Sequence, residues 1–219
     1  MSLKLYAHPF SSYCQKVLIA LYENGTPFEL RMLAPDAPKA AAEHEALWPL
    51  KRMHVLVDQG RTAVESSIII EHLGLHHPGP VRLIPADARA ALPVRMMDRF
   101  FDGYVSTPMQ KIVGDSLRNT EDRDRHGVAD ARRTLETAYR WLETAIAGRE
   151  WAAGDDFSLA DCAAAPALFY ADWSHPIGEA FPNVSAYRQR LLARSSFARA
   201  VDEARPFRPF FPLGAPDRD

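Results

Sequence analysis

Hydrophobic positions in the first 80 residues change their period along the chain. Residues 3–7 alternate between apolar and polar side chains, which is typical of a half-buried strand, whereas apolar residues after Ser11 recur every three or four positions, as in a helix. The same two patterns predict strands over 3–7, 28–33, 54–58 and 62–64, and helices after Ser11, within 34–49 and after Ser66. The order is βαβαββα. Because a helix joins the first two strands, we expect them to be parallel in a mixed sheet.

Strand patterns disappear after residue 88. One helical pattern is interrupted near residues 106–108, and the next has one apolar and one charged face. An almost wholly apolar stretch then predicts a central buried helix. The helical patterns cover 88–118, 123–148, 158–173, 184–193 and 195–203, and a proline-rich tail that we expect to be irregular follows them.

The change from mixed to purely helical patterns predicts two domains. We expect an α/β domain at residues 1–78, a linker rich in proline and glycine at 79–87, and an all-helical domain at 88–219. The start of the central helix carries its own signal, since Ser158 and Asp161 have the S-x-x-D spacing of a capping box. We interpret that pair as structural.

Composition excludes several functional classes. The chain has 219 residues and a net charge of −2, so no basic field favours nucleic acid. It has no apolar run near the roughly 20 residues of a membrane span. The first ten residues lack a signal-peptide pattern, and Cys14 and Cys162 form no disulfide framework, so we expect a cytoplasmic protein. The scattered histidines, including adjacent His76 and His77, predict no metal site.

Two serines and a cysteine in "FSSYC" (10–14) stand where the first helix begins. A helix N-terminus presents unpaired N–H groups and a partial positive charge, so it lowers the pKa of a thiolate placed there. A hydroxyl at the same place donates a hydrogen bond to a bound thiolate. Alternatively, Ser11 or Ser12 is only an N-cap.

Glu65 and Ser66 lie between a predicted strand and the helix that follows it. Backbone N–H groups at such a helix start bind carboxylates, and a neighbouring glutamate accepts hydrogen bonds from an amine. The pair therefore suits the head group of an α-amino acid. The alternative is again structural, with Ser66 as the N-cap.

Three longer stretches together resemble the cytosolic glutathione transferases: "LYAHPFSSYCQKVLIALYENGTPFEL", "VLVDQGRTAVESSIIIEHL" and "WAAGDDFSLADCAAAPAL". Each lies where that family has the corresponding pattern. The resemblance implies a thioredoxin-like N-terminal domain joined to an all-helical one. It also implies glutathione as co-substrate, a small hydrophobic electrophile as second substrate, a role in detoxification and a homodimer.

The resemblance implies roles for particular residues as well. Ser11 looks like the hydroxyl that activates the glutathione thiol in serine-type members, with Ser12 as the alternative. Glu65 and Ser66 match the contacts to the γ-glutamyl group. Arg52, next to Lys51, lies near the expected position of the glycyl carboxylate, although both cations also fit a solvated loop.

The run "FSSYCQKVLIAL" is similar to the pattern of the zeta class, with Lys16 in place of an arginine. However, Tyr13 stands where that pattern has its cysteine, and Cys14 comes one residue later. This departure argues against the isomerase activity of the zeta class.

A second departure concerns His54, which stands where the family has a cis-proline. The backbone of the preceding residue, here Met53, pairs with the cysteinyl part of glutathione in the family. We expect the Met53–His54 bond to remain cis despite its cost of about 2.5–4 kcal/mol, because the flanking strand and hairpin patterns are intact. The alternative is a trans bond, which would shift the Met53 backbone and weaken glutathione binding. We expect the imidazole itself to lie at the surface, although it could also reach the site.

Candidates for the second-substrate pocket are Tyr104 in the long helical pattern and Trp173 at the end of the central helix, although such aromatic residues also fit the core. Two other functions stay open. One is thiol-disulfide exchange through Cys14. The other is a non-catalytic binding module, for which His54 in the proline position is the main argument.

Overall fold

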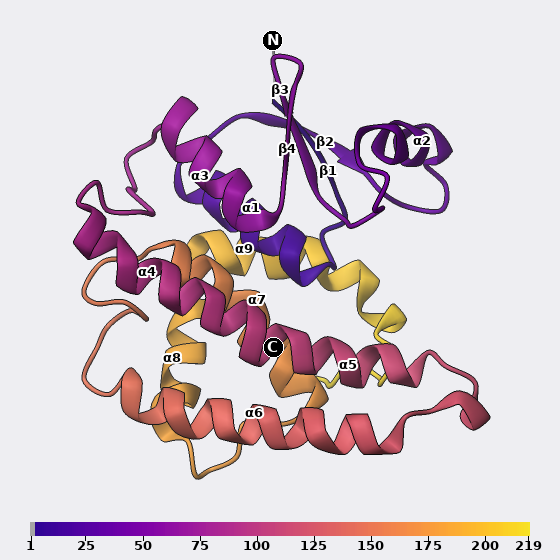
Figure 1. The fold of residues 1–219 in the computed structure, drawn as a ribbon, viewed down its shortest axis with the longest axis vertical. Helices are drawn as coiled ribbons and strands as arrows, with labels where there is room; N and C mark the ends of the chain where they lie inside the picture. Colours follow the sequence, from indigo (N-terminus) through magenta and orange to yellow (C-terminus); the bar gives the residue numbers. More distant parts are fainter. Residues whose placement is uncertain (1–2) are drawn as a thin grey trace.

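The computed structural model describes residues 3–219, so the first two residues of the predicted N-terminal domain lie outside the described part. A sheet with its helices occupies one end of the molecule, and a group of helices occupies the other (Figure 1). Within residues 3–219, no helix is both long enough and apolar enough to cross a bilayer.

The N-terminal part has the predicted order βαβαββα. Its elements are β1 (Leu3–Ala7), α1 (Ser12–Glu23), β2 (Phe28–Met32), α2 (Pro38–Leu47), β3 (Val55–Asp58), β4 (Arg61–Val64) and α3 (Ser66–His76). The strand order in the sheet is β2-β1-β3-β4, with β1 parallel to β2 and antiparallel to β3, and with β3 antiparallel to β4. The expected mixed, thioredoxin-like sheet is thus confirmed.

The rest of the chain is helical, as predicted. Its elements are α4 (Ala88–Phe100), the π-helical η1 (Phe101–Ser106), α5 (Thr107–Ser116), the 3₁₀ turn η2 (Thr120–Asp122), α6 (Arg125–Ala145), α7 (Leu159–Ser174), α8 (Pro182–Ala193), α9 (Ser195–Ala204) and the 3₁₀ segment η3 (Arg205–Phe210). The tail is therefore less irregular than the sequence predicts, since its first six residues form η3.

The interruption predicted near residues 106–108 is a change of helix type rather than a break. The N–H of Thr107 reaches back to the carbonyl of Asp102, five residues earlier, and the Thr107 hydroxyl donates to the same oxygen at 2.9 Å. Pro108 has no N–H to continue the ordinary pattern. As a result, α4, η1 and α5 follow one another without a loop.

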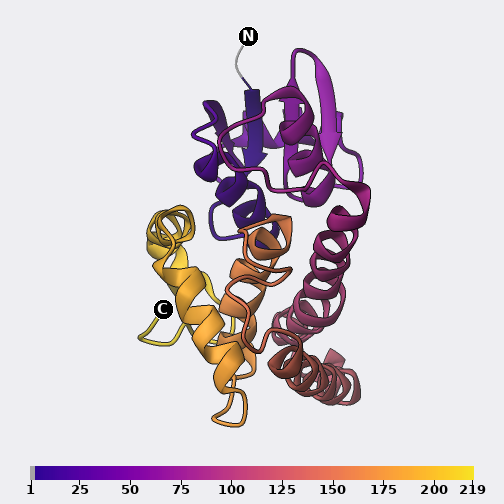
Figure 2. The same cartoon turned by 90° about the vertical axis from the view of Figure 1, so that its left-hand side faces the viewer.

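Helix α7 lies at the centre of the helical part, and α1 of the N-terminal part packs against it (Figure 2). All sixteen residues of α7 are buried. The predicted capping box is present at its start, where the carboxylate of Asp161 accepts hydrogen bonds from the backbone N–H and the hydroxyl of Ser158, both at 2.9 Å. Helix α1 of the first domain therefore packs on a helix that is buried along its whole length.

A buried cation joins the two parts. Lys16 of α1 has a side-chain exposure of 1%, and its Nζ lies 2.6 Å from Asp98 Oδ1 and 2.9 Å from Asp102 Oδ2. It also donates to the Ser67 hydroxyl at 3.0 Å. Burial raises the pKa of Asp102, whereas the nearby Lys16 opposes that rise. Four residues from α1, α3, α4 and η1 therefore fix the orientation of the first domain.

The segment between the two parts is held close to α1. The side chain of Asn24 accepts a hydrogen bond from the Val81 N–H at 2.8 Å. Gly79 is required beside it, because a Cβ at that position would overlap the Asn24 side chain. The domain boundaries 1–78 and 88–219 stay a prediction.

Candidate functional site

Ser11 is the N-cap of α1, with extended backbone angles and a hydroxyl that makes no capping hydrogen bond. Its backbone still closes the first turn, because the Ser11 carbonyl accepts from the Gln15 N–H at 2.9 Å. Ser12 is the first helical residue, and both serines are half-buried. The structure therefore does not show the Ser11 hydroxyl capping the helix, as the purely structural interpretation requires.

Cys14 is fully buried in the core beneath the sheet. Burial raises the pKa of its thiol to about 11, although hydrogen bonds from the Ser11 hydroxyl and the His8 backbone act in the opposite direction. Thiol exchange requires an accessible thiolate. Neither condition holds for Cys14, so its environment does not favour the redox alternative.

Glu65 and Ser66 occupy the start of α3. Glu65 is the N-cap, with φ 67° and ψ 121°, and its carbonyl accepts from the Ile69 N–H at 2.8 Å. The N-cap is therefore Glu65 and not Ser66, which is the first helical residue and is buried. A positive φ at a residue with a Cβ is strained, and such strain concentrates at functional sites. The exposed Glu65 side chain remains free to accept from an amine.

His54 overturns two sequence expectations. No peptide bond within residues 3–219 is cis, so the Met53–His54 bond is trans, which avoids the cost of a cis bond before a residue other than proline. The chain instead enters β3 with a φ of 70° at His54. The imidazole is also buried rather than at the surface, with an exposure of 8%.

The buried His54 ring is neutral. Burial lowers its pKa to about 4, and the charges of Lys16 and His44 act in the same direction. Its Nδ1 is buried without a hydrogen-bond partner, and its ring lies 6.3 Å from that of Tyr13. An unpartnered polar atom in such a position is costly.

Tyr13 follows the two serines and is half-buried. Burial and the charge of Asp102 raise the pKa of its hydroxyl to about 12, while a hydrogen bond with Ser106 acts against them. The phenol is therefore protonated at neutral pH. Its ring lies beside that of His54, so these two residues are neighbours in the fold.

The loop before β3 carries the other predicted contacts. Met53 and Arg52 are exposed, and the Arg52 carbonyl is hydrogen-bonded to the His44 ring at 2.9 Å. Lys51 already pairs with Glu45 at 2.5 Å. In residues 3–219, the Arg52 guanidinium has no ion-pair partner, so it is the better placed of the two cations to bind an anion.

The two second-substrate candidates lie in different environments. Trp173 is buried, and its ring packs on Phe211, whose ring in turn lies 6.5 Å from that of Phe10 beside the serines. Tyr104 is 59% exposed and lines a groove formed by α4, η1 and α6. The structure thus places only Trp173 in the aromatic cluster that adjoins Ser11.

That cluster includes the C-terminal tail, which sequence reasoning missed. The rings of Phe10 and Tyr170 meet edge to face at 5.5 Å, and the ring of Phe207 lies 4.5 Å from that of His8. Gln15 supports the turn by donating to the Pro9 carbonyl at 2.9 Å and to the Tyr170 hydroxyl at 3.1 Å. The only sequence signal was the high aromatic content of the tail.

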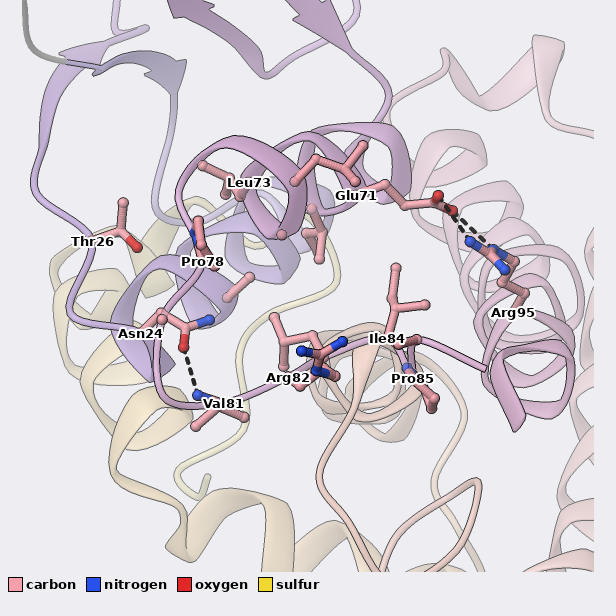
Figure 3. Close-up of a pocket in the computed structure, with 17 residues that line it drawn as sticks. Asn24, Thr26, Glu71, Leu73, Pro78, Val81, Arg82, Ile84, Pro85 and Arg95 are labelled. Carbon is pink, nitrogen blue, oxygen red and sulfur yellow. Dashed lines mark hydrogen bonds and ion pairs between the residues drawn. The ribbon is translucent and has the colours of Figure 1, made fainter. Parts of the chain in front are cut away.

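A separate cavity of about 370 Å³ lies under the segment that joins the two parts (Figure 3). At one side Arg95 of α4 forms a bidentate ion pair with Glu71 of α3, at 3.0 and 3.1 Å. None of the predicted catalytic or glutathione-binding residues lines this cavity. It is therefore distinct from the candidate site.

The fold combines a thioredoxin-like sheet domain with an all-helical domain. Polar groups lie at the starts of α1 and α3, so the chain belongs to a class of proteins that bind a ligand on the first domain beside the helical one. Family models match both parts: the glutathione S-transferase N-terminal domain matches residues 5–81, and the glutathione S-transferase C-terminal domain matches residues 103–195. The chain belongs to the glutathione S-transferase family.

A solved glutathione S-transferase from Methylobacterium radiotolerans, in complex with glutathione sulfonate, is 32% identical to this chain, with a TM-score of 0.79, covering 92% of this chain and 95% of that one. A stringent starvation protein A homolog from Haemophilus ducreyi is 25% identical, covering 93% and 92%. The maleylacetoacetate isomerase of Rattus norvegicus is 26% identical, covering 88% and 89%. Because these relatives are named for different activities, membership in the family does not fix the reaction.

Proposed function

We propose that this protein is a glutathione transferase that binds glutathione with its thiol beside the start of α1. The observation that carries the proposal is the Ser11 hydroxyl, which stands at the N-cap without capping the helix. That hydroxyl, which lies beside the Cys14 thiol, turns to donate a hydrogen bond to the glutathione sulfur, and the helix N-terminus stabilises the negative charge. Ser12 is the alternative donor.

The neighbouring residues supply contacts for the other parts of the tripeptide. Glu65 accepts from the α-amino group, and the N–H groups at the start of α3 bind the γ-glutamyl carboxylate. Arg52 pairs with the glycyl carboxylate. The backbone of the exposed Met53 contacts the cysteinyl part, although its trans bond to His54 presents that backbone differently from the cis bond expected from the sequence. The relative in complex with glutathione sulfonate supports this choice of ligand.

The thiolate then attacks an electrophilic second substrate. The aromatic cluster of Phe10, Tyr170, Trp173 and Phe211 supplies an apolar wall next to Ser11, so a small hydrophobic electrophile fits best. Glutathione carries the nucleophile, and the protein contributes orientation and charge stabilisation. Tyr104 is not part of this wall. It lines the groove formed by α4, η1 and α6, which we call the α4–α6 groove.

The paired variants Ser11→Ala and Ser12→Ala test the role of the hydroxyl. We expect Ser11→Ala to reduce turnover with a model electrophile about a hundredfold, as loss of a preorganised donor does, and to raise the pKa of the bound thiol toward its free value. We expect Ser12→Ala to have the smaller effect. Both quantities are measured from the pH dependence of the thiolate absorbance and of the initial rate. A larger effect of Ser12→Ala would give the role to that residue.

A non-catalytic binding module is the second candidate, since one of the relatives, the stringent starvation protein A homolog, is not named for an enzymatic activity. Calorimetry with glutathione separates the two candidates. Absence of binding would overturn the transferase proposal and favour the module. Binding without conjugation, combined with activity on a mixed disulfide that Cys14→Ser removes, would instead favour the oxidoreductase.

We also propose that the protein is a cytoplasmic homodimer. The α4–α6 groove supports self-association, because Met96, Tyr104 and Trp141 expose 47%, 59% and 43% of their surfaces there. We expect light scattering to give twice the chain mass, and Trp141→Arg to give the monomer mass. Leu117→Arg, at an exposed leucine outside the groove, is the matched control. A monomeric wild type would contradict the proposal.

A further inference from the structure

Three potential metal ligands meet at the end of α3 farthest from Ser66. Asp58 is the last residue of β3, His72 lies in α3, and His77 is the C-cap of α3. The Nε2 atoms of His72 and His77 lie 2.9 and 2.8 Å from the same oxygen, Asp58 Oδ2. The proposed glutathione chemistry uses none of these residues.

The cluster is partly enclosed. The side chains of Asp58, His72 and His77 are 10%, 15% and 28% exposed, so an ion can enter from solvent while the ligands stay held by the fold. The three ligand atoms all lie within 4.8 Å of one another. Sequence spacing did not predict this arrangement, because the hairpin turn, strand β4 and about two turns of α3 separate the Asp58 carboxylate from the His72 imidazole.

The donor set selects a class of metal. Two imidazole nitrogens and one carboxylate oxygen suit Zn²⁺ and other divalent transition ions better than Mg²⁺ or Ca²⁺. Ligand atoms about 2.1 Å from a tetrahedral Zn²⁺ lie about 3.4 Å from each other. The observed separations of 2.8 and 2.9 Å therefore need to open by only about half an ångström, which small rotations of two partly exposed rings supply.

His76 is a candidate fourth ligand whose ring must turn toward the site, because it is not among the groups whose ligand atoms lie within 4.8 Å of one another. His76 is exposed, and its ring centroid lies 4.4 Å from that of His72. On a helix, residues four apart share a face, so His72 and His76 point in similar directions. Either His76 or a water molecule completes four-coordination.

We propose that Asp58, His72 and His77 form a binding site for a divalent transition metal ion such as Zn²⁺. The ion joins the β3–β4 hairpin to the C-terminal end of α3. Because α3 carries Ser66 at its opposite end, the ion acts as a structural clip and takes no part in the reaction. The site does not depend on the proposed glutathione chemistry.

Calorimetry with Zn²⁺ tests the site on untagged, chelator-treated full-length protein. We expect one ion per chain and a melting temperature that rises with Zn²⁺. Asp58→Asn and His77→Gln should each weaken binding at least about tenfold, since loss of even an outer partner of a metal ligand costs this much. Co²⁺ as a second probe should give the visible absorption of a tetrahedral site, which both variants lose.

His126→Gln is the matched control, because His126 also faces a carboxylate, Asp130 at 3.4 Å, but its side chain is 88% exposed and has no third ligand. We expect this variant to bind Zn²⁺ as the wild type does. His77 is the most exposed of the three ligands, so His77→Gln keeps the test valid even if Asp58→Asn fails to fold. Absence of saturable binding at micromolar Zn²⁺, or equal losses in His77→Gln and His126→Gln, would overturn the proposal.

Discussion

The φ angle of His54 determines whether proline is tolerated at this position. Its φ of 70° lies in a region that proline, fixed near −65°, does not reach. If the bond before residue 54 were cis, as the sequence predicts, proline would be the residue that accommodates it at least cost. The observed conformation reverses that expectation.

We predict that His54→Pro lowers the free energy of unfolding by more than about 1 kcal/mol, since proline at an incompatible φ destabilises by at least that amount. It should also weaken glutathione binding, because Met53 must shift. His54→Gly is the control, since glycine accepts a positive φ. Chemical denaturation and calorimetry give the two quantities, and a His54→Pro variant as stable as His54→Gly would contradict the argument.

Sequence reasoning at the residue scale succeeded where neighbours in sequence are neighbours in space. The positions of Ser11 at the start of α1 and of Glu65 at the start of α3 follow from local periodicity. The burial of His54 and the meeting of Asp58 with His72 depend on packing between separate elements. Local periodicity contains no information about such contacts.

At the scale of elements, the capping box of α7 shows how one carboxylate can hold several segments. Asp161 is fully buried and accepts from the Ala152 N–H at 2.8 Å and from the Tyr187 hydroxyl at 2.6 Å, in addition to its two bonds from Ser158. The sequence predicted the bonds to Ser158. The more distant partners became visible only in the fold.

We predict that Asp161→Ala lowers the free energy of unfolding by about 3 kcal/mol or more, because it leaves several buried donors without an acceptor. Asp87→Ala at the exposed N-cap of α4, where the carboxylate accepts only from the Ala90 N–H at 2.7 Å, is the matched control. It should cost about 1 kcal/mol. Urea denaturation of both variants makes the comparison, and equal losses would show that the wider network adds nothing.

Most elements were predictable because their apolar positions repeat with a clear period. The exceptions are η1, η2 and η3, whose π and 3₁₀ geometries differ from an α-helix by where each N–H finds its acceptor. Such a choice leaves little trace in hydrophobic periodicity. The proline and hydroxyl residues at 106–108 marked the place of η1 but not its form.

At the scale of the whole molecule, two ion pairs bridge the same two parts of the chain in contrasting surroundings. Lys16 and Asp98 have side-chain exposures of 1% and 3%, whereas Arg95 and Glu71 have exposures of 45% and 32%. A buried charge that loses its partner has no water to compensate it. The two pairs therefore allow a matched test of what holds the parts together.

We predict that Lys16→Met lowers the free energy of unfolding by about 3 kcal/mol or more, because Asp98 and Asp102 lose their buried cation and keep only the exposed Arg99 guanidinium. Arg95→Met should cost about 1 kcal/mol or less. Equilibrium denaturation followed by tryptophan fluorescence measures both changes. Similar small costs for the two variants would mean that apolar packing between α1 and α7 alone sets the orientation of the first domain.

The π-helical segment η1 has a consequence for how this chain tolerates changes in length. Met109 and Ile112, in the helix that follows, are both buried. Inserting one more residue into 101–106 would rotate every later position of α5 by about 100° and push it forward by about 1.5 Å. Those two side chains would then point away from their packing partners. Deleting one residue there would instead let the segment return to ordinary α-helical bonding with α5 in place, because a π-helical turn already holds one extra residue.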